Sequence, residues 1–354
     1  MKYLKIIFIL ISLIIGAEYI GRIYIKYEVQ KINDFNFANK SYGILIPDNE
    51  LGFVHRGNSY NRSRISNNFG FLNFKDVKLP QKRNKNDKIL ISYGGSTTYG
   101  YNVNQKETWP YLLNKKICNL NSAEKICNDL VLNAGHIMWS AGHIYIKAKR
   151  DIPIIKPDYI IIYSGINEFS NYLHLKKNKK INIDKIIENQ SYGIVTQAYN
   201  WWFIRYNSIV LKILNYYGIN PLKKIIQKYS NIDEQKLYKI AEKDYDKIYK
   251  NYIEVLKKII TFSKKNGTEV IYVSQISGID TKKNIFLTSF SQKAIKEIKS
   301  LGITVIDSMN FIKTYDGNKK ELFSNSGVHF SKYGSELFAD FLIQSISKLS
   351  DFNK

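Results

Sequence analysis

Ser96 follows two glycines at the end of a strongly apolar run, and this is the feature of the chain that most directly suggests chemistry. The run, residues 88–93, contains the β-branched residues that favour a strand. Open parallel sheets bind their ligands at the carboxyl ends of strands, where glycines permit a tight turn and leave room for a substrate. The pattern makes Ser96 a candidate nucleophile, although Gly-Gly-Ser is also ordinary loop composition.

Three further polar segments follow the same rule. Gly135 comes shortly after the predicted strand 130–133, and Asn167 comes shortly after the predicted strand 159–163. His329 stands just ahead of the last predicted helix. Transfer of an acyl group from an ester needs a nucleophile, a base within hydrogen-bond reach, and donors aimed at the developing oxyanion. These residues supply each of those groups.

The roles follow from the chemistry of each side chain. Ser96 would attack the ester, and His329 would take its proton and return it to the leaving alcohol. The backbone N–H groups of Ser96 and Gly135, with the side-chain amide of Asn167, would form the oxyanion hole. The sequence therefore predicts serine catalysis, with no cofactor and no metal.

The elements that must position these residues alternate along the chain. Strands and helices in alternation predict a parallel sheet covered by helices on both faces. Right-handed crossovers then bring the carboxyl ends of all the strands to one edge. The predicted strands cover residues 88–93, 130–133, 159–163, 268–274 and 303–307, and the predicted helices cover 108–117, 140–149, 234–264, 290–300 and 331–349.

Together the four segments resemble the SGNH (GDSL-type) serine hydrolase superfamily, named for its Ser, Gly, Asn and His blocks. They occur in the family order over about residues 45–349, and the lead-in also looks like that of membrane-anchored bacterial members. The resemblance implies a flavodoxin-like three-layer α/β/α fold with about five parallel strands. It also implies the absence of a metal, and hydrolysis or transfer of acyl groups, often on carbohydrates or lipids. The blocks here are residues 94–98, 133–135, 165–168 and 326–329.

One position departs from the family pattern. Family members usually carry an aspartate three residues before the histidine, and here that residue is Ser326. A serine hydroxyl can accept a hydrogen bond but brings no negative charge. Three alternatives follow: a dyad in which Ser326 or a backbone carbonyl orients His329, an acid supplied from elsewhere, or a slow or inactive enzyme. Asp307 is the nearest substitute acid in sequence, although a loop cap explains it as well.

The N-terminus predicts a membrane segment. Residues 6–17 carry no charge, and Glu18 and Arg22 then interrupt an apolar stretch that continues to about residue 25. Spaced four apart on a helix, these two side chains can pair. We expect residues 1–28 to form an uncleaved signal anchor or transmembrane helix, with a cleaved signal peptide as the alternative. Either segment places the main domain outside the cytoplasm, in the periplasm or at the cell surface.

Composition bounds the rest of the chain. The 354 residues carry a formal net charge of +23, but the excess is mostly lysine spread along the chain, and no nucleic-acid-binding motif accompanies it. We expect residues 29–87 to be a linker and irregular lead-in, and residues 88–349 to be one hydrolase domain. An insertion at about 171–232 is expected to form a helical lid whose Trp201 and Trp202 either pack on the domain or contact the substrate.

Several other residues invite a functional interpretation but fit a structural one as well. His136 and His143 could line the pocket or lie buried in the fold. Glu168 could be structural or contact the substrate. Cys118 and Cys127 could form a short-loop disulfide in an oxidising compartment or remain two thiols.

The predicted function is hydrolysis of an O-acyl ester, with an O-acetyl group on an envelope polysaccharide or glycolipid as the expected substrate. An O-acyltransferase using the same residues is one alternative, because a sugar hydroxyl can replace water in resolving an acyl-enzyme. The other is a catalytically inactive SGNH domain that binds glycan or scaffolds an assembly. The expected partners are the acylated carbohydrate or lipid and the membrane, without nucleic acid.

Overall fold

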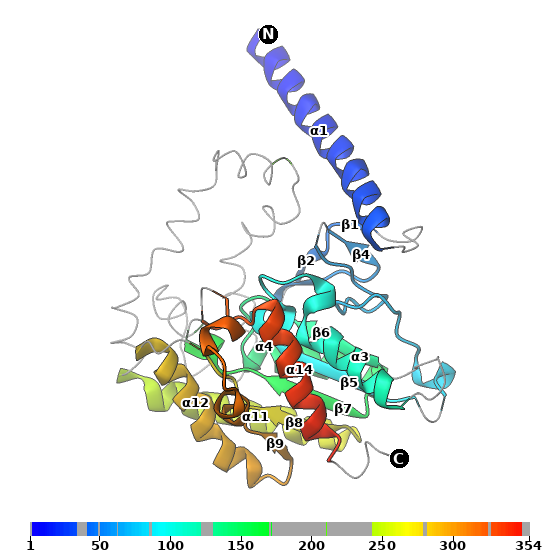
Figure 1. Cartoon of the computed structure of the whole chain (residues 1–354). Helices are drawn as coiled ribbons and strands as arrows, with labels where there is room; N and C mark the ends of the chain where they lie inside the picture. The colour runs from blue at the N-terminus through cyan, green and yellow to red at the C-terminus, as the bar shows by residue number, and fades with distance from the viewer. Residues whose placement is uncertain are drawn as a thin grey trace.

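The computed structural model describes residues 2–33, 41–48, 50–61, 63–84, 87–121, 130–169, 243–278, 282–324 and 327–348, together with Asn171 and Val210. Its centre is a five-stranded parallel sheet in the order β6-β5-β7-β8-β9 (Figure 1). This is the flavodoxin-like order, and it confirms the predicted sheet. The strands are β5 (Ile89–Gly94), β6 (Leu130–Gly135), β7 (Tyr159–Tyr163), β8 (Glu269–Val273) and β9 (Thr304–Ile306).

Helices cover both faces of the sheet and bury its alternating side chains. Ile89, Ile91 and Tyr93 of β5 join one apolar core, and Leu90 joins the core on the other face. The first core is closed by α4 (Ala141–Ile155), α11 (Tyr245–Lys265) and α12 (Lys282–Lys299). The second is closed by α3 (Trp109–Asn121), α13 (Met309–Thr314) and α14 (Lys332–Ile346).

The segment expected to be a linker is folded against the domain instead. It forms two small sheets, one pairing β1 (Ser41–Tyr42) with β4 (Ser59–Tyr60) and the other pairing β2 (Leu45–Asp48) with β3 (Gly52–His55). Apolar side chains between and within these strands are buried. Removing their apolar area from water offsets the conformational entropy that the segment loses on folding. The folded domain therefore begins near residue 41 rather than at 88.

An ion pair fixes the lead-in strands to the helical layer. The guanidinium of Arg150, on α4, contacts the Asp48 carboxylate with its closest N–O distance at 2.6 Å, and it also bonds the Glu50 carboxylate. Hydrogen bonds from Arg150 and from the backbone of Leu51 lower the pKa of Asp48, against the opposing effect of burial. This charged cluster, together with apolar packing, holds the antiparallel hairpin β2–β3 in place.

The lead-in also covers the edge of the sheet. Leu72 donates its N–H to the Asn133 carbonyl at 2.9 Å, and the Asn133 N–H donates to Asn73 Oδ1 at 2.8 Å. Asn73 Nδ2 in turn donates to the Val131 carbonyl at 2.8 Å. These bonds satisfy the outer side of β6, the edge strand, which would otherwise present unpaired backbone groups.

The N-terminal helix α1 (Lys2–Asn33) extends away from the domain, and its C-terminal end lies beside β1 and β4 (Figure 1). Its residues Tyr3–Tyr24 form a span of 22 residues with a mean hydropathy of 2.1, none of it buried in the protein. A helix of that length is about 33 Å long, enough for a hydrocarbon core of roughly 30 Å. The predicted Glu18–Arg22 pair is present at 3.2 Å. The helix fits a membrane anchor or a signal sequence.

Two predictions fall partly or wholly outside the described residues. Cys118 is disulfide-bonded, and its predicted partner Cys127 lies outside that part of the chain. The expected lid at 171–232, with Trp201 and Trp202, also lies outside it except for Asn171 and Val210.

Candidate active site

Ser96 lies where β5 gives way to a short helix, α2 (Ser96–Tyr99), at the carboxyl edge of the sheet. Gly95 lies between the strand and the helix, and a β-carbon there would lie 2.5 Å from Asn167 Nδ2 and 3.3 Å from the Trp139 carbonyl oxygen. The glycine therefore leaves room for the close approach of two other segments. The same approach brings Asn167 next to the serine.

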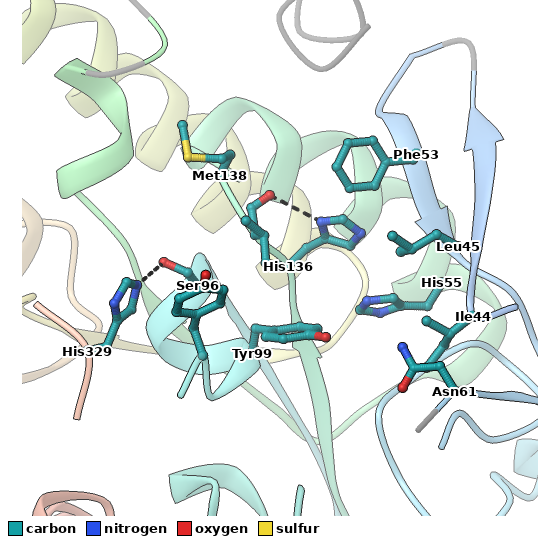
Figure 2. A pocket seen from close by; sticks show the side chains of 12 residues that line it. Ile44, Leu45, Phe53, His55, Asn61, Ser96, Tyr99, His136, Met138 and His329 are labelled. Atoms are coloured by element: carbon teal, nitrogen blue, oxygen red, sulfur yellow. Dashed lines mark hydrogen bonds between the residues drawn. The ribbon is translucent and has the colours of Figure 1, made fainter. Parts of the chain in front are cut away.

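His329 meets Ser96 from the far end of the chain. Its Nε2 is 2.7 Å from Ser96 Oγ (Figure 2). The histidine lies in the turn before α14, where its carbonyl accepts the N–H of Ser324 at 2.7 Å. For the serine hydroxyl to donate to Nε2, the ring proton must be on Nδ1. The distance is that of a hydrogen bond between a nucleophile and its base.

Burial sets the charge of the His329 side chain. It lowers the pKa of His329 to about 4, because the imidazolium loses hydration in the site. The imidazole is therefore neutral at neutral pH and able to accept a proton. This is the form that a general base needs.

Asn167 is oriented by a neighbouring turn. Its Nδ2 donates one hydrogen bond to the Trp139 carbonyl at 2.8 Å. A side-chain amide carries a second N–H. With Gly95 between it and the nucleophile, this amide is well placed as one donor of an oxyanion hole.

Gly135 has a different role from the one expected. Its N–H donates to Asn133 Oδ1 at 2.9 Å, so the donor is already committed within the strand end. A β-carbon at this position would clash with the backbone of Thr98 and Tyr99. The glycine thus lets α2 pack on β6, and the structure does not direct its N–H toward a substrate.

Met138 is a residue of the site that sequence reasoning missed. It lines the same cavity as Ser96, and its φ of 66° puts it in the left-handed region that a bulky residue rarely adopts. Its N–H has no acceptor among the described residues, while its carbonyl accepts from Asn171 Nδ2 at 3.1 Å. No sequence signal marks it, because a methionine is not the residue that such a turn favours.

Gln275, also missed, links the segments that carry the three site residues. Its Oε1 accepts the N–H of Ile166, the neighbour of Asn167, at 3.0 Å. Its Nε2 donates to Thr97 Oγ1, beside Ser96, at 3.5 Å, and that hydroxyl donates to the carbonyl of Val328, beside His329, at 3.3 Å. The amide is 5% exposed, so this network is shielded from water.

Removing the hydroxyl of this network should misplace the base. We expect Thr97→Val to lower kcat for ester hydrolysis about tenfold with little change in KM, because the contact to the His329 segment is lost while the shape is kept. Steady-state kinetics measure the split. Thr314→Val, at an exposed threonine on α13, is the matched control. Equal kcat in the two variants would contradict a positioning role.

The other singled-out residues are structural. Asp307 Oδ1 accepts from Gln292 Nε2 at 2.8 Å and from the Met309 N–H at 2.9 Å, so it caps α13 and is not the acid beside His329. Glu168 Oε1 accepts the Ala141 N–H at the start of α4 at 2.6 Å, and burial raises its pKa to about 8. Ser326 lies outside the described residues.

The histidines form a stack rather than a metal centre. His136 lies between His55 and Trp139, with ring centroids 4.5 and 4.6 Å away, and His143 follows on the far side of Trp139. His55 and His136 line the cavity, whereas His143 shares a capping box with Ser140 at the start of α4. Within the described part of the chain, no three metal-ligating side chains converge.

Solved structures similar to this chain are described as lipolytic proteins, lipases or esterases. They include a lipase/acylhydrolase from Enterococcus faecalis (16% identity, TM-score 0.43, covering 74% of this chain and 96% of that one). Another is a lipolytic protein of the G-D-S-L family from Veillonella parvula (13% identity, TM-score 0.43, covering 74% of this chain and 100% of that one). A third is a psychrotrophic esterase from Pseudoalteromonas (13% identity, TM-score 0.41, covering 75% of this chain and 100% of that one). No protein-family model and no curated protein matches the chain.

Proposed function

We propose that this chain is an SGNH-type serine hydrolase that cleaves O-acyl esters through Ser96 and His329. The 2.7 Å contact between Ser96 Oγ and His329 Nε2, beside an apolar cavity at the carboxyl edge of a parallel sheet, is the observation that carries the proposal. A neutral imidazole at this distance can accept the serine proton as the hydroxyl attacks.

The reaction proceeds in two halves. Ser96 Oγ attacks the ester carbonyl carbon while its proton passes to His329 Nε2, and the carbonyl π electrons move to the oxygen. Collapse of the tetrahedral intermediate breaks the bond to the alcohol oxygen, which takes the proton from Nε2 and leaves an acyl-Ser96. Water then attacks the acyl carbon, giving its proton to Nε2. The second collapse releases the carboxylic acid and returns that proton to Ser96 Oγ.

Three donors would stabilise the oxyanion in this scheme. Ser96 lies at the N-terminus of α2, so its N–H has no partner within that helix. The Asn167 amide and the Met138 N–H supply the others. Each preorganised donor of this kind contributes a factor of about 10² to 10³ in kcat.

A membrane location is part of the proposal. The apolar span of α1 supports an anchor that holds the domain outside the cytoplasm, where acylated envelope carbohydrates and lipids would be the substrate classes. Protease accessibility of the domain in intact cells and in lysed cells would test this orientation. Protection from the protease in cells whose outer envelope is permeabilised but whose cytoplasmic membrane is intact would place the domain in the cytoplasm and contradict the proposed orientation.

Covalent labelling tests the nucleophile directly. We expect a fluorophosphonate probe to label the full-length protein at one serine, Ser96, because its hydroxyl is hydrogen-bonded to a neutral base. Ser96→Ala should lose the label and at least 10³-fold of the p-nitrophenyl ester hydrolysis. Ser300→Ala, at an exposed serine, is the matched control and should keep both.

The products then separate the remaining functions. Release of free acid in the presence of an added sugar supports the hydrolase, and an acylated sugar would indicate the transferase. Absence of both label and product would leave a domain that binds its ligand without cleaving it, and the enzyme proposal would be wrong.

A further inference from the structure

A cavity of about 250 Å³ opens beside Ser96 and extends to the lead-in strands. Most of its apolar lining comes from three places: the hairpin β2–β3 with the residue before it, the turn after β6, and α2 with the turn after it. Figure 2 shows His329 on one side of Ser96 and the hairpin side chains on the other. The apolar residues that form the walls include Ile44, Leu45, Phe53, Tyr101, Ile137 and Met138.

The few polar residues of the wall are engaged with the protein or covered. His136 Nδ1 bonds the Ile137 carbonyl at 3.2 Å, and its Nε2, like that of His55, is buried with no hydrogen-bond partner. Asn61 uses its Oδ1 to accept the backbone N–H groups of Ser63 and Arg64. Burial lowers the pKa of His136 to about 3, so the ring is uncharged. The cavity therefore presents carbon to a ligand.

The geometry of the reaction decides which part of an ester enters this cavity. His329 Nε2 must reach the oxygen of the leaving alcohol to protonate it, so the alcohol lies on the His329 side of Ser96. The acyl substituent then points to the opposite side, toward Phe53 and Leu45. The acyl group, not the alcohol, is the part in contact with the apolar walls.

The volume sets the length of that group. An apolar cavity of about 150 Å³ holds a benzene ring with its six carbons, and on that scale this cavity of about 250 Å³ holds roughly ten carbons. An acetyl group has two carbons and would leave most of the cavity without contacts.

We infer that the cavity is an acyl pocket and that the protein is selective for medium-length aliphatic acyl esters, about six to ten carbons long, rather than for acetyl esters. This inference rests on the proposed function and sharpens it, replacing the acetyl group expected from the sequence. The hairpin β2–β3 is then the element that determines acyl length, because it supplies the wall farthest from His329.

A chain-length series tests the inference. The full-length protein is placed in lipid nanodiscs free of detergent, since detergent tails would compete for an apolar cavity. The kcat/KM values for p-nitrophenyl esters from acetate to dodecanoate are then measured below their aggregation concentrations. We expect kcat/KM to rise about fourfold for each added methylene up to six to ten carbons, the factor that corresponds to about 0.8 kcal/mol, and then to fall.

The series also separates failure of this inference from failure of the proposed function. Hydrolysis that depends on Ser96 but is fastest with acetate, or is equal for all chains, would overturn the acyl pocket and leave the esterase standing. No Ser96-dependent hydrolysis and no fluorophosphonate labelling would overturn both.

Two wall variants are expected to change the chain-length preference in opposite directions, which distinguishes an effect on the cavity from misfolding. Leu45→Trp fills the cavity and should lower the octanoate-to-acetate ratio of kcat/KM at least tenfold. Phe53→Ala enlarges it and should move the optimum to chains longer than in the wild type. A folding defect lowers all rates together and cannot move an optimum in either direction. Ile154→Trp, at a residue of α4 that is 52% exposed, is the control and should keep the wild-type profile.

Discussion

Replacing His329 by alanine is expected to lower kcat for ester hydrolysis by about 10⁴-fold or more, as severely as Ser96→Ala. The two side chains act as one unit across the 2.7 Å hydrogen bond, and residues that act as a unit have strongly non-additive effects. The double variant should therefore be no worse than either single variant within about threefold. Single-turnover kinetics with a p-nitrophenyl ester would measure all three.

A matched histidine variant controls for loss of structure. His143 is buried like other core residues, but it lies outside the cavity and bonds Ser140 at the start of α4. We expect His143→Gln to lower the melting temperature while reducing kcat less than tenfold. If His143→Gln and His329→Ala lost the same activity, the effect would be structural and His329 would not be the base.

The pH dependence of kcat/KM is the second large effect that we expect. Since burial lowers the pKa of His329 to about 4, the base stays neutral until the pH falls to about that value. Activity should be nearly constant between pH 6 and 7.5, and its acid limb should have a midpoint near 4. An imidazole with its ordinary pKa of about 6.5 would already be mostly protonated at pH 6.

The same shift affects stability in a defined direction. Between pH 4 and 6.5 the unfolded chain binds more protons at this histidine than the folded chain does, so the free energy of unfolding rises with pH across that window. His329→Ala removes this contribution to the free energy of unfolding.

For activity, a wild-type acid limb of kcat/KM near pH 6.5, with full activity only above pH 7, would contradict the buried neutral base.

Ser326→Asp should move the acid limb upward. The SGNH pattern that the sequence resembles has an aspartate at this position, and a carboxylate close to an imidazole favours its charged form by 1 to 3 pKa units. We expect the midpoint to rise toward 5 to 7, with an increase in kcat because the imidazolium formed during attack is stabilised. Ser326→Asn, which has a similar shape without the charge, is the control and should keep the midpoint near 4. An unchanged limb in both variants would place the carboxylate out of reach of His329.

Much of the fold was predictable because local patterns and topology agree. The apolar run 159–163 became β7 with the predicted ends, and the alternation of strands and helices gave the five parallel strands. The pairing of Ser96 with His329 was expected from that topology as well, since parallel strands deliver their following residues to one edge. Neither expectation required knowledge of a particular contact.

The site differed from expectation where long-range contacts set the backbone conformation or the hydrogen-bond partners of a residue. Gly135 looked like an oxyanion donor, yet its conformation is set by the backbone of α2 packing against it. Met138 and Gln275 gave no local signal, because one depends on an unusual φ and the other on bonds to two distant segments. The lead-in was taken for a linker because its apolar residues are scattered, and only the folded domain shows that they are buried.

The lead-in strands make the domain that carries Ser96 and His329 inseparable from the stretch of chain that follows α1. A released fragment that began at residue 88 would lose Phe53 and Leu45 from the cavity, and it would also lose Leu72 and Asn73 from the edge of β6. The exposed edge would invite aggregation, and the cavity beside Ser96 would be open to solvent on the side away from His329. Any naturally shed or deliberately truncated soluble form that keeps its specificity must therefore be cut before residue 41, between the domain and α1.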